Sequence, residues 1–207
     1  MKMNLPNKLT VLRLILVPVI LVVMVLPYSI LNNAIALIVF AGASITDYFD
    51  GKIARRDNLI TDFGKFLDPL ADKFMVIAAI FGIVCRSHET GDHFTFWIFM
   101  GMLIITIFRE LAVASIRLIA STKANVVVAA DILGKIKTVA QIVCIILALV
   151  EPVAHEILGI IFPEFLLTKF FGFYAFTYLG AAVSIVFTIW SGMNYILASW
   201  KYLDPEK

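Results

Sequence analysis

The sequence predicts an all-α membrane protein, and three observations indicate this fold class. Of the 207 residues, 61% are hydrophobic and only 15% are charged, and the mean hydropathy is +0.97. Soluble domains are about 45–50% apolar, so this composition is typical of a chain that lies in a lipid bilayer. Six apolar stretches are each long enough for a membrane-spanning helix, which needs about 20 residues. We expect these helices at 8–27, 32–54, 65–85, 95–120, 126–150 and 173–199.

The distribution of basic residues predicts the orientation of these helices. All but two of the 17 Lys and Arg residues fall in the N-terminal segment, the second-to-third connection, the fourth-to-fifth connection or the C-terminal segment. The two exceptions are Arg86 and Lys169. Because basic residues favour the cytoplasmic side of a membrane, we expect both termini in the cytoplasm. No polar stretch is longer than a loop, so we expect one domain over residues 1–207.

Several local patterns have simple structural explanations. Basic residues, Arg13 among them, precede the first apolar run as in a secretory signal, but no small-residue cleavage pattern follows, so we expect a retained helix. Cys85 and Cys144 are isolated and form no metal or redox pattern. The polar loop at 88–93 lacks a helical pair of histidines and is expected to be solvated. The net charge of +2 gives no indication of a nucleic-acid partner.

Four aspartates lie where an apolar composition disfavours them. Asp47 and Asp50 are spaced i,i+3, and Asp68 and Asp72 are spaced i,i+4, so each pair occupies one face of its helix. A carboxylate in a membrane helix is costly unless a partner compensates it. Two such helices joined by a short turn would bring the four carboxylates together, and cations between them would relieve their repulsion. All-oxygen ligation favours Mg²⁺ or Mn²⁺ over zinc or copper.

A second polar concentration surrounds the fourth-to-fifth connection. Arg109 and Arg117 are eight residues apart, so they lie on roughly one helical face, and Arg109 lies inside the apolar sequence. We expect Arg109, Arg117 and Lys135 to bind an anion. For Lys137, anion binding and membrane topology are equally good explanations. Lys123 needs only the topological explanation.

Polar and small residues elsewhere predict local contacts. Asn7 or Thr10 is expected either to cap the first helix or to form a polar wall beside the aspartates. Thr61 or Asp62 is expected to cap the third helix. Small residues in the last apolar stretch predict a close helix–helix contact, within the chain or between the subunits of an expected homodimer. These residues are Gly180, Ala181, Ser184 and Gly192.

The aspartates belong to a longer pattern, D-x2-D-G-x2-A-R-x8-G-x3-D-x3-D. This pattern resembles the signature of the CDP-alcohol phosphotransferases, and eight fixed positions within 26 residues make the match specific. A narrower resemblance, to bacterial members that use glycerol 3-phosphate, rests on residues 6–13, 64–73, 109–117 and 134–138. The matched signature positions are Asp47, Asp50, Gly51, Ala54, Arg55, Gly64, Asp68 and Asp72.

The resemblance implies an enzyme that transfers the phosphatidyl group of CDP-diacylglycerol to glycerol 3-phosphate and releases CMP. It implies two Mg²⁺ or Mn²⁺ ions at the four aspartates, with Asp72 also acting as the general base. It places the enzyme in a bacterial cytoplasmic membrane with its site facing the cytoplasm. The acceptor phosphate would be held by Arg109, Arg117, Lys135 and Lys137. The residues expected around CDP-diacylglycerol are Asn7, Thr10, Asp47, Gly51, Ala54, Arg55 and Thr61.

Two alternatives follow from the same residues. Other family members use inositol phosphate, phosphatidylglycerol, serine or a neutral amino alcohol as the acceptor, and the basic residues favour a phosphorylated one. An ion- or proton-coupled transporter would also place carboxylates in membrane helices. Transporters often contain internal repeats or paired broken helices. The sequence contains neither pattern, and its four aspartates are close together, so we favour the enzyme.

Overall fold

The computed structural model describes residues 4–56, 61–124, 132–162 and 174–200, with the backbone alone at 48–55 and 121–124. Within these ranges all the regular structure is helical, which confirms the predicted all-α class. Most helix ends lie within a few residues of their predicted positions. The helices are α1 (Leu5–Val25), α2 (Ile30–Arg56), α3 (Asp62–Glu89), α4 (His93–Ala124), α5 (Ile132–Ile161) and α7 (Ala175–Ser199).

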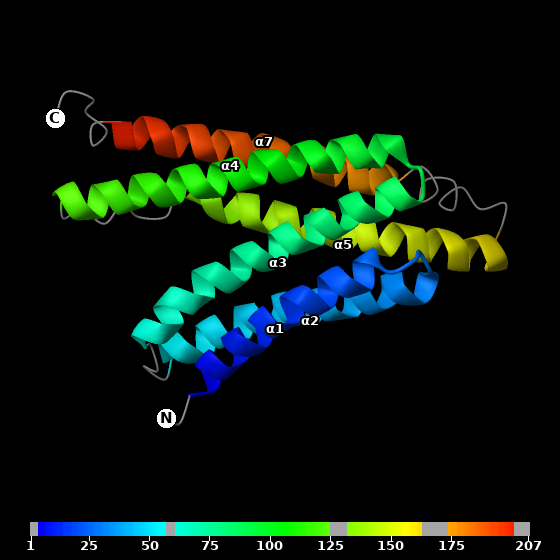
Figure 1. The fold of residues 1–207 in the computed structure, drawn as a ribbon, viewed down its shortest axis with the longest axis horizontal. Helices are drawn as coiled ribbons and strands as arrows, with labels where there is room; N and C mark the ends of the chain where they lie inside the picture. Colours follow the sequence, from blue (N-terminus) through cyan, green and yellow to red (C-terminus); the bar gives the residue numbers. More distant parts are fainter. Residues whose placement is uncertain (1–3, 57–60, 125–131, 163–173, 201–207) are drawn as a thin grey trace.

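These helices form a closed ring in which each one packs mainly against two neighbours, and α3 also contacts α5 and α2. Around the ring, α1 contacts α3, α3 contacts α4, α4 contacts α7, α7 contacts α5, α5 contacts α2, and α2 returns to α1. Figure 1 shows that consecutive helices run in opposite directions. The start of α1, the end of α2, the start of α3, the end of α4, the start of α5 and the end of α7 therefore lie on one side of the bundle. We call this side the site end.

Five of the described helices are long and apolar enough to cross a membrane, namely α1, α2, α4, α5 and α7. This finding supports the prediction of a polytopic membrane protein. The helix α3 differs because charged residues such as Asp72, Lys73 and Arg86 lie toward both of its ends. Its crossing of the bilayer stays a prediction, as does the cytoplasmic location of the termini.

Side-chain caps fix two helix starts at the site end. The helix α3 begins after Thr61, whose Oγ1 accepts a hydrogen bond from the Gly64 amide at 3.0 Å, as expected for an N-cap. For Asn7 and Thr10 the sequence leaves two alternatives, a cap of α1 or a polar wall beside the aspartates, and the cap alternative is wrong. The helix begins earlier, and the side chain of Asn4 accepts a hydrogen bond from the Asn7 amide at 3.1 Å. Asn7 and Thr10 therefore lie within α1, where both are buried and make tertiary contacts.

The helix α5 is longer than predicted, since it continues through Pro152 to Ile161. The predicted end at 150 preceded Glu151 and Pro152, two residues that are unfavourable inside an apolar helix. The Glu151 side chain is buried and has a partner in another helix. Its two carboxylate oxygens accept hydrogen bonds from the amides of Phe176 and Thr177 at 3.0 and 2.7 Å. These bonds satisfy free amides at the start of α7 and connect α7 to α5.

The small residues of α7 make close contacts within the chain. A β-carbon added at Gly180 would lie 3.3 Å from Cα of Cys144 in α5. A β-carbon added at Gly192 would lie 3.0 Å from Cγ of Arg109 in α4. These two glycines therefore allow α7 to approach two neighbouring helices, which agrees with the intramolecular form of the prediction. The predicted homodimer is untested by the structure of one chain.

A pair of glycine substitutions tests the packing of α3 on α1. A β-carbon at Gly82 would lie 2.7 Å from Sδ and 2.8 Å from Cβ of Met24, a buried residue of α1. We expect Gly82→Ala to lower the free energy of unfolding by about 1–3 kcal/mol, because the core must move to admit the methyl group. The control is Gly101→Ala in α4, where no atom lies within 4 Å of the added carbon.

Because alanine is favoured over glycine in helices, Gly101→Ala should not destabilise the protein. Thermal unfolding of the purified protein in detergent measures both changes. An equal loss of stability in the two variants would contradict the packing described for α1 and α3.

Candidate active site

The four aspartates come from the end of α2 and the start of α3. Asp47 and Asp50 lie in about the last three turns of α2, and Asp68 and Asp72 lie in about the first three turns of α3. Both segments lie at the site end, close to the first turn of α1 (Figure 1). The side chain of Asp50 falls outside the described set.

Arg13 of α1 lies between the aspartates of the two helices. Its Nη1 donates hydrogen bonds to Oδ1 of Asp47 at 2.5 Å and to Oδ1 of Asp72 at 2.6 Å. The Arg13 side chain is 1% exposed, whereas the two carboxylates are 40% and 43% exposed. The structure therefore brings one aspartate from each predicted pair to a common point. In the sequence, Arg13 counts only among the basic residues that set the topology, so sequence reasoning misses this role. The signal that could have identified it is the presence of an arginine inside an apolar helix.

Asp68 faces a polar wall formed by the starts of α1 and α3. The Thr10 hydroxyl donates to Oδ1 of Asp68 at 2.5 Å, and the Thr61 hydroxyl donates to Oδ1 of Asn7 at 3.0 Å. Gly64 lies close to these side chains, and a β-carbon at this position would be 2.9 Å from Oδ1 of Asn7. The structure thus places Asn7, Thr10 and Thr61 along one side of Asp68. The remaining predicted donor-binding residues, Gly51, Ala54 and Arg55, lie outside the described side chains.

The carboxylates suit a hard divalent cation. Oδ1 of Asp47 and Oδ1 of Asp72 both bind Nη1 of Arg13, so these two carboxylates lie close together, and Asp68 lies one turn before Asp72 on the same helix. Oxygen donors without His or Cys match Mg²⁺ or Mn²⁺. Among the described side chains, no three His, Cys, Asp or Glu residues are grouped closely enough to form a metal site. The set of four ligands, which includes Asp50, therefore remains a prediction.

A cavity of about 340 Å³ adjoins Asp72, and we call it the Asp72 cavity. It combines the predicted base with basic side chains from three helices. Its volume is in the range of small-ligand sites, roughly 300 Å³ and above. Its lining residues include Asp72 and Lys73 of α3, Arg109, Glu110 and Arg117 of α4, and Lys137, Thr138 and Gln141 of α5.

A second cavity, of about 450 Å³, adjoins Asp47, and we call it the Asp47 cavity. It contains Lys135 and shares Arg109, Arg117 and Thr138 with the Asp72 cavity. The four predicted anion-binding residues therefore line two neighbouring cavities, each of which also contains one of the aspartates that contact Arg13.

The basic residues divide into two kinds by their contacts. Oε1 of Glu110 accepts hydrogen bonds from Nζ of Lys137 at 2.5 Å and from Nη1 of Arg109 at 3.0 Å. Arg117 and Lys135 make no hydrogen bond or ion pair with any described residue, and the Arg117 guanidinium lies 5.9 Å from the ring centroid of Tyr195. Arg117 and Lys135 are therefore free to pair with an anion, whereas Lys137 and Arg109 already share a carboxylate.

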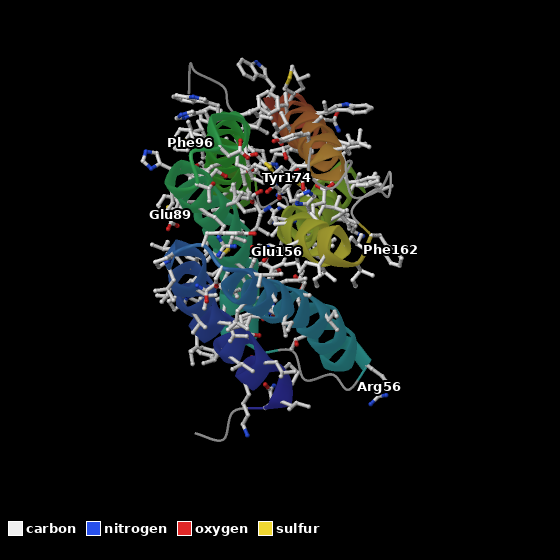
Figure 2. All side chains as sticks on the ribbon, turned by 90° about the vertical axis from the view of Figure 1, so that its right-hand side faces the viewer. Arg56, Glu89, Phe96, Glu156, Phe162 and Tyr174 are labelled. Atoms are coloured by element: carbon white, nitrogen blue, oxygen red, sulfur yellow. The ribbon has the colours of Figure 1, made fainter. Side chains whose placement is uncertain are left out.

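Among the described residues, the opposite end of the bundle lacks this combination of groups. Figure 2 looks onto that end and shows Tyr174 near its centre, with Glu89 and Glu156 on different helices around it. A cavity of about 400 Å³ there is lined by Tyr28, Arg86 and other residues, of which Asp92 is the only carboxylate. Paired carboxylates beside several cations occur, within the described residues, at the site end.

A helical membrane bundle with carboxylates beside a basic cavity is suited to an enzyme that acts on anionic substrates. The sequence profile of the CDP-alcohol phosphatidyltransferases matches residues 3–190, so the chain belongs to this family of metal-dependent phosphotransferases. The resemblance inferred from the aspartate pattern is therefore confirmed.

Curated relatives match nearly the full length of the chain. A protein of Bacillus subtilis is 36% identical over 214 aligned positions, and the alignment covers 98% of each chain. A protein of Pseudomonas fluorescens is 33% identical and covers 99% of this chain and 94% of its own length. A protein of Salmonella typhimurium is 35% identical, with 96% of each chain covered. All three are named CDP-diacylglycerol–glycerol-3-phosphate 3-phosphatidyltransferase.

Proposed function

We propose that this chain transfers the phosphatidyl group from CDP-diacylglycerol to glycerol 3-phosphate, releasing CMP and leaving phosphatidylglycerophosphate in the membrane. The observation that carries the proposal is the meeting of Asp72 with the cations Lys73, Arg117 and Lys137 in one cavity. A proton acceptor beside an anion site is what attack by a phosphorylated alcohol requires. The names of the curated relatives state the same reaction and support the assignment.

The donor occupies the aspartate side of the site in this proposal. Asn7, Thr10 and Thr61 offer polar groups beside Asp68, and Gly64 allows the Asn7 side chain to approach the backbone of α3 closely. By the family pattern, Gly51, Ala54 and Arg55 complete this surface. The diacylglycerol part stays in the lipid. Only the CDP group then enters the site end, which requires no passage of charge through the bilayer.

A divalent cation fits this arrangement. We propose that Asp47, Asp50, Asp68 and Asp72 hold Mg²⁺ or Mn²⁺, with two ions by family resemblance. The bound metal would neutralise the pyrophosphate and stabilise the attacking and leaving oxygens. Arg13, already between Asp47 and Asp72, fixes how these carboxylates face each other.

The acceptor occupies the basic side of the site. Arg117 and Lys135, which carry no ion pair within the described structure, hold the phosphate of glycerol 3-phosphate, with Arg109 and Lys137 beside them. Asp72 takes the proton of the 1-hydroxyl. The hydroxyl oxygen then bonds to the phosphorus linked to diacylglycerol, and the bond from that phosphorus to the CMP oxygen breaks.

An assay with several acceptors tests the proposed function. Purified protein is assayed for CMP release from CDP-diacylglycerol with glycerol 3-phosphate, inositol phosphate, phosphatidylglycerol and serine. We expect glycerol 3-phosphate to support the fastest release, with phosphatidylglycerophosphate as the lipid product. Faster release with inositol phosphate or phosphatidylglycerol would keep the family chemistry and overturn the acceptor. No CMP release with any of these acceptors would contradict the proposed reaction.

The proposed setting is the cytoplasmic membrane of a bacterium, with the protein present as a homodimer and the site end facing the cytoplasm. The bacterial relatives and the apolar helices support a location in a bacterial membrane. The basic residues support the orientation, since among the described ones Arg86 alone lies at the end of the bundle opposite the site end. Light scattering of the detergent-solubilised protein would determine the oligomeric state.

Cysteine labelling tests the orientation through the two ends of α3. Asp62 and Glu89 are both exposed acidic residues, one at each end of this helix. In a background without Cys85 and Cys144, a cysteine at Glu89 should react with a membrane-impermeant thiol reagent in intact cells. A cysteine at Asp62 should react only after permeabilisation. The reverse result would separate the site from the cytoplasmic nucleotide and acceptor pools and contradict the proposed function.

A further inference from the structure

The two carboxylate oxygens of Glu110 have different surroundings. Oε1 accepts the hydrogen bonds from Lys137 and Arg109. Oε2 accepts none from the described residues, and Nζ of Lys73 lies 3.7 Å away, beyond hydrogen-bond range. Some buried side-chain atoms of the described residues have neither a hydrogen-bond partner nor contact with solvent, and Oε2 is not one of them. Since Oε2 has no hydrogen-bond partner among these residues, it must contact solvent. Because Glu110 lines the Asp72 cavity, we infer that Oε2 reaches the surface of this cavity.

The position of Oε2 is fixed because the other oxygen of the same carboxylate is bound. Glu110 is 8% exposed, and the bonds from Lys137 and Arg109 fix the plane of the group. An ionised carboxylate oxygen accepts hydrogen bonds and repels phosphate. It therefore suits a neutral hydroxyl group of a ligand whose phosphate is bound elsewhere.

An acceptor in the Asp72 cavity has such a hydroxyl. In the proposed function, which this inference extends, the phosphate of glycerol 3-phosphate pairs with Arg117 and its 1-hydroxyl faces Asp72. The hydroxyl on the middle carbon is used by neither residue. Glu110 lines the same cavity as these two residues, so the three groups surround one small ligand.

We propose that Oε2 of Glu110 accepts a hydrogen bond from the middle hydroxyl of glycerol 3-phosphate and makes the enzyme selective for a phosphorylated diol. Glu110 thus has two roles through its two oxygens. Oε1 positions Lys137 and Arg109, and Oε2 recognises the acceptor. A site that hydrogen-bonds a substrate hydroxyl discriminates against an analogue that lacks it, because the polar group of the site is then left unpaired.

The test compares glycerol 3-phosphate with 3-hydroxypropyl phosphate, which keeps the phosphate and the primary hydroxyl and lacks the middle one. The readout is the ratio of kcat/KM for the two acceptors. We expect a preference of roughly ten- to a hundredfold for glycerol 3-phosphate in the unmodified enzyme, the size of a hydrogen bond to a charged group. Glu110→Met should reduce the ratio to about one, and Glu110→Gln should give an intermediate ratio.

The ratio also remains valid if the variants fold poorly, because both acceptors are measured on the same folded fraction. Thr106→Val is the control. It removes another hydroxyl that lines this cavity and that accepts a hydrogen bond from Gln141 at 2.9 Å. This variant should keep the original ratio.

An unchanged ratio in both Glu110 variants would overturn the inference, as would a ratio that is lost in Thr106→Val alone. Equal use of the two acceptors by the unmodified enzyme would also overturn it, while leaving the proposed function intact. Use of neither acceptor would instead show that the proposed function is wrong.

Discussion

Asp72→Asn should lower turnover by roughly 10²- to 10⁴-fold while leaving the binding of CDP-diacylglycerol largely intact. Asparagine has nearly the same shape as aspartate but does not accept a proton, and a general base contributes a rate factor of this size. The amide oxygen can still accept the hydrogen bond that Arg13 donates to Asp72. The local geometry should therefore survive the change. CMP release measures turnover, and binding of a radiolabelled donor measures the first step separately.

The matched control for this substitution lies at the start of the same helix, α3. Asp62→Asn makes the same chemical change on α3, but the Asp62 side chain is 99% exposed and contacts only Lys65, at 3.0 Å, within the described structure. Turnover in this control should equal that of the unmodified enzyme. If Asp72→Asn also retained full turnover, the proton acceptor would have to be another residue.

Arg117→Ala should lower kcat/KM for glycerol 3-phosphate by roughly ten- to more than a hundredfold, mainly through a higher KM. Arg117 lines both basic cavities and has no ion pair within the described residues, so its charge is available to the acceptor phosphate. Removing a charge-assisted hydrogen bond costs about 1.5–3 kcal/mol, which corresponds to this change in rate constant. Steady-state kinetics with each substrate varied in turn measures the effect.

A second basic residue serves as the control for Arg117. Lys65→Ala removes an exposed cation on α3 whose partner is Asp62, and both KM values should stay unchanged. If Arg117→Ala weakened donor binding and left the acceptor KM unchanged, the basic cavities would belong to CDP-diacylglycerol. The division of the site into a donor side and an acceptor side would then be wrong.

Local sequence patterns could predict the helices and the candidate carboxylates, because both depend on short spacings. Apolar runs of bilayer length located α1 to α4 and α7 within a few residues. The end of α5 was missed because Glu151 appears unfavourable in isolation and becomes favourable only when its carboxylate binds the start of α7. Such a partner lies 25 residues away in the chain at the closest and leaves no periodic signal.

The partners of the aspartates were beyond sequence reasoning for the same reason. The spacing of Asp68 and Asp72 predicts a shared helical face, but their partners differ, since Thr10 contacts Asp68 and Arg13 contacts Asp72. Glu110 is adjacent to Arg109 in the sequence, yet its pairing with Lys137 joins α4 to α5, two helices that are not neighbours in the ring. Tertiary packing therefore determines which of the predicted cations remain free for an anion.

Metal-dependent product formation is the most direct test of the central claim, that carboxylates and a basic cavity act together in phosphatidyl transfer. Purified enzyme, CDP-diacylglycerol and glycerol 3-phosphate are combined with and without chelator, and CMP and the lipid product are both quantified. We predict equimolar CMP and phosphatidylglycerophosphate, no turnover with chelator, and recovery when Mg²⁺ or Mn²⁺ is added in excess. Full turnover in metal-free buffer, or CMP release without the phosphorylated lipid, would contradict the account.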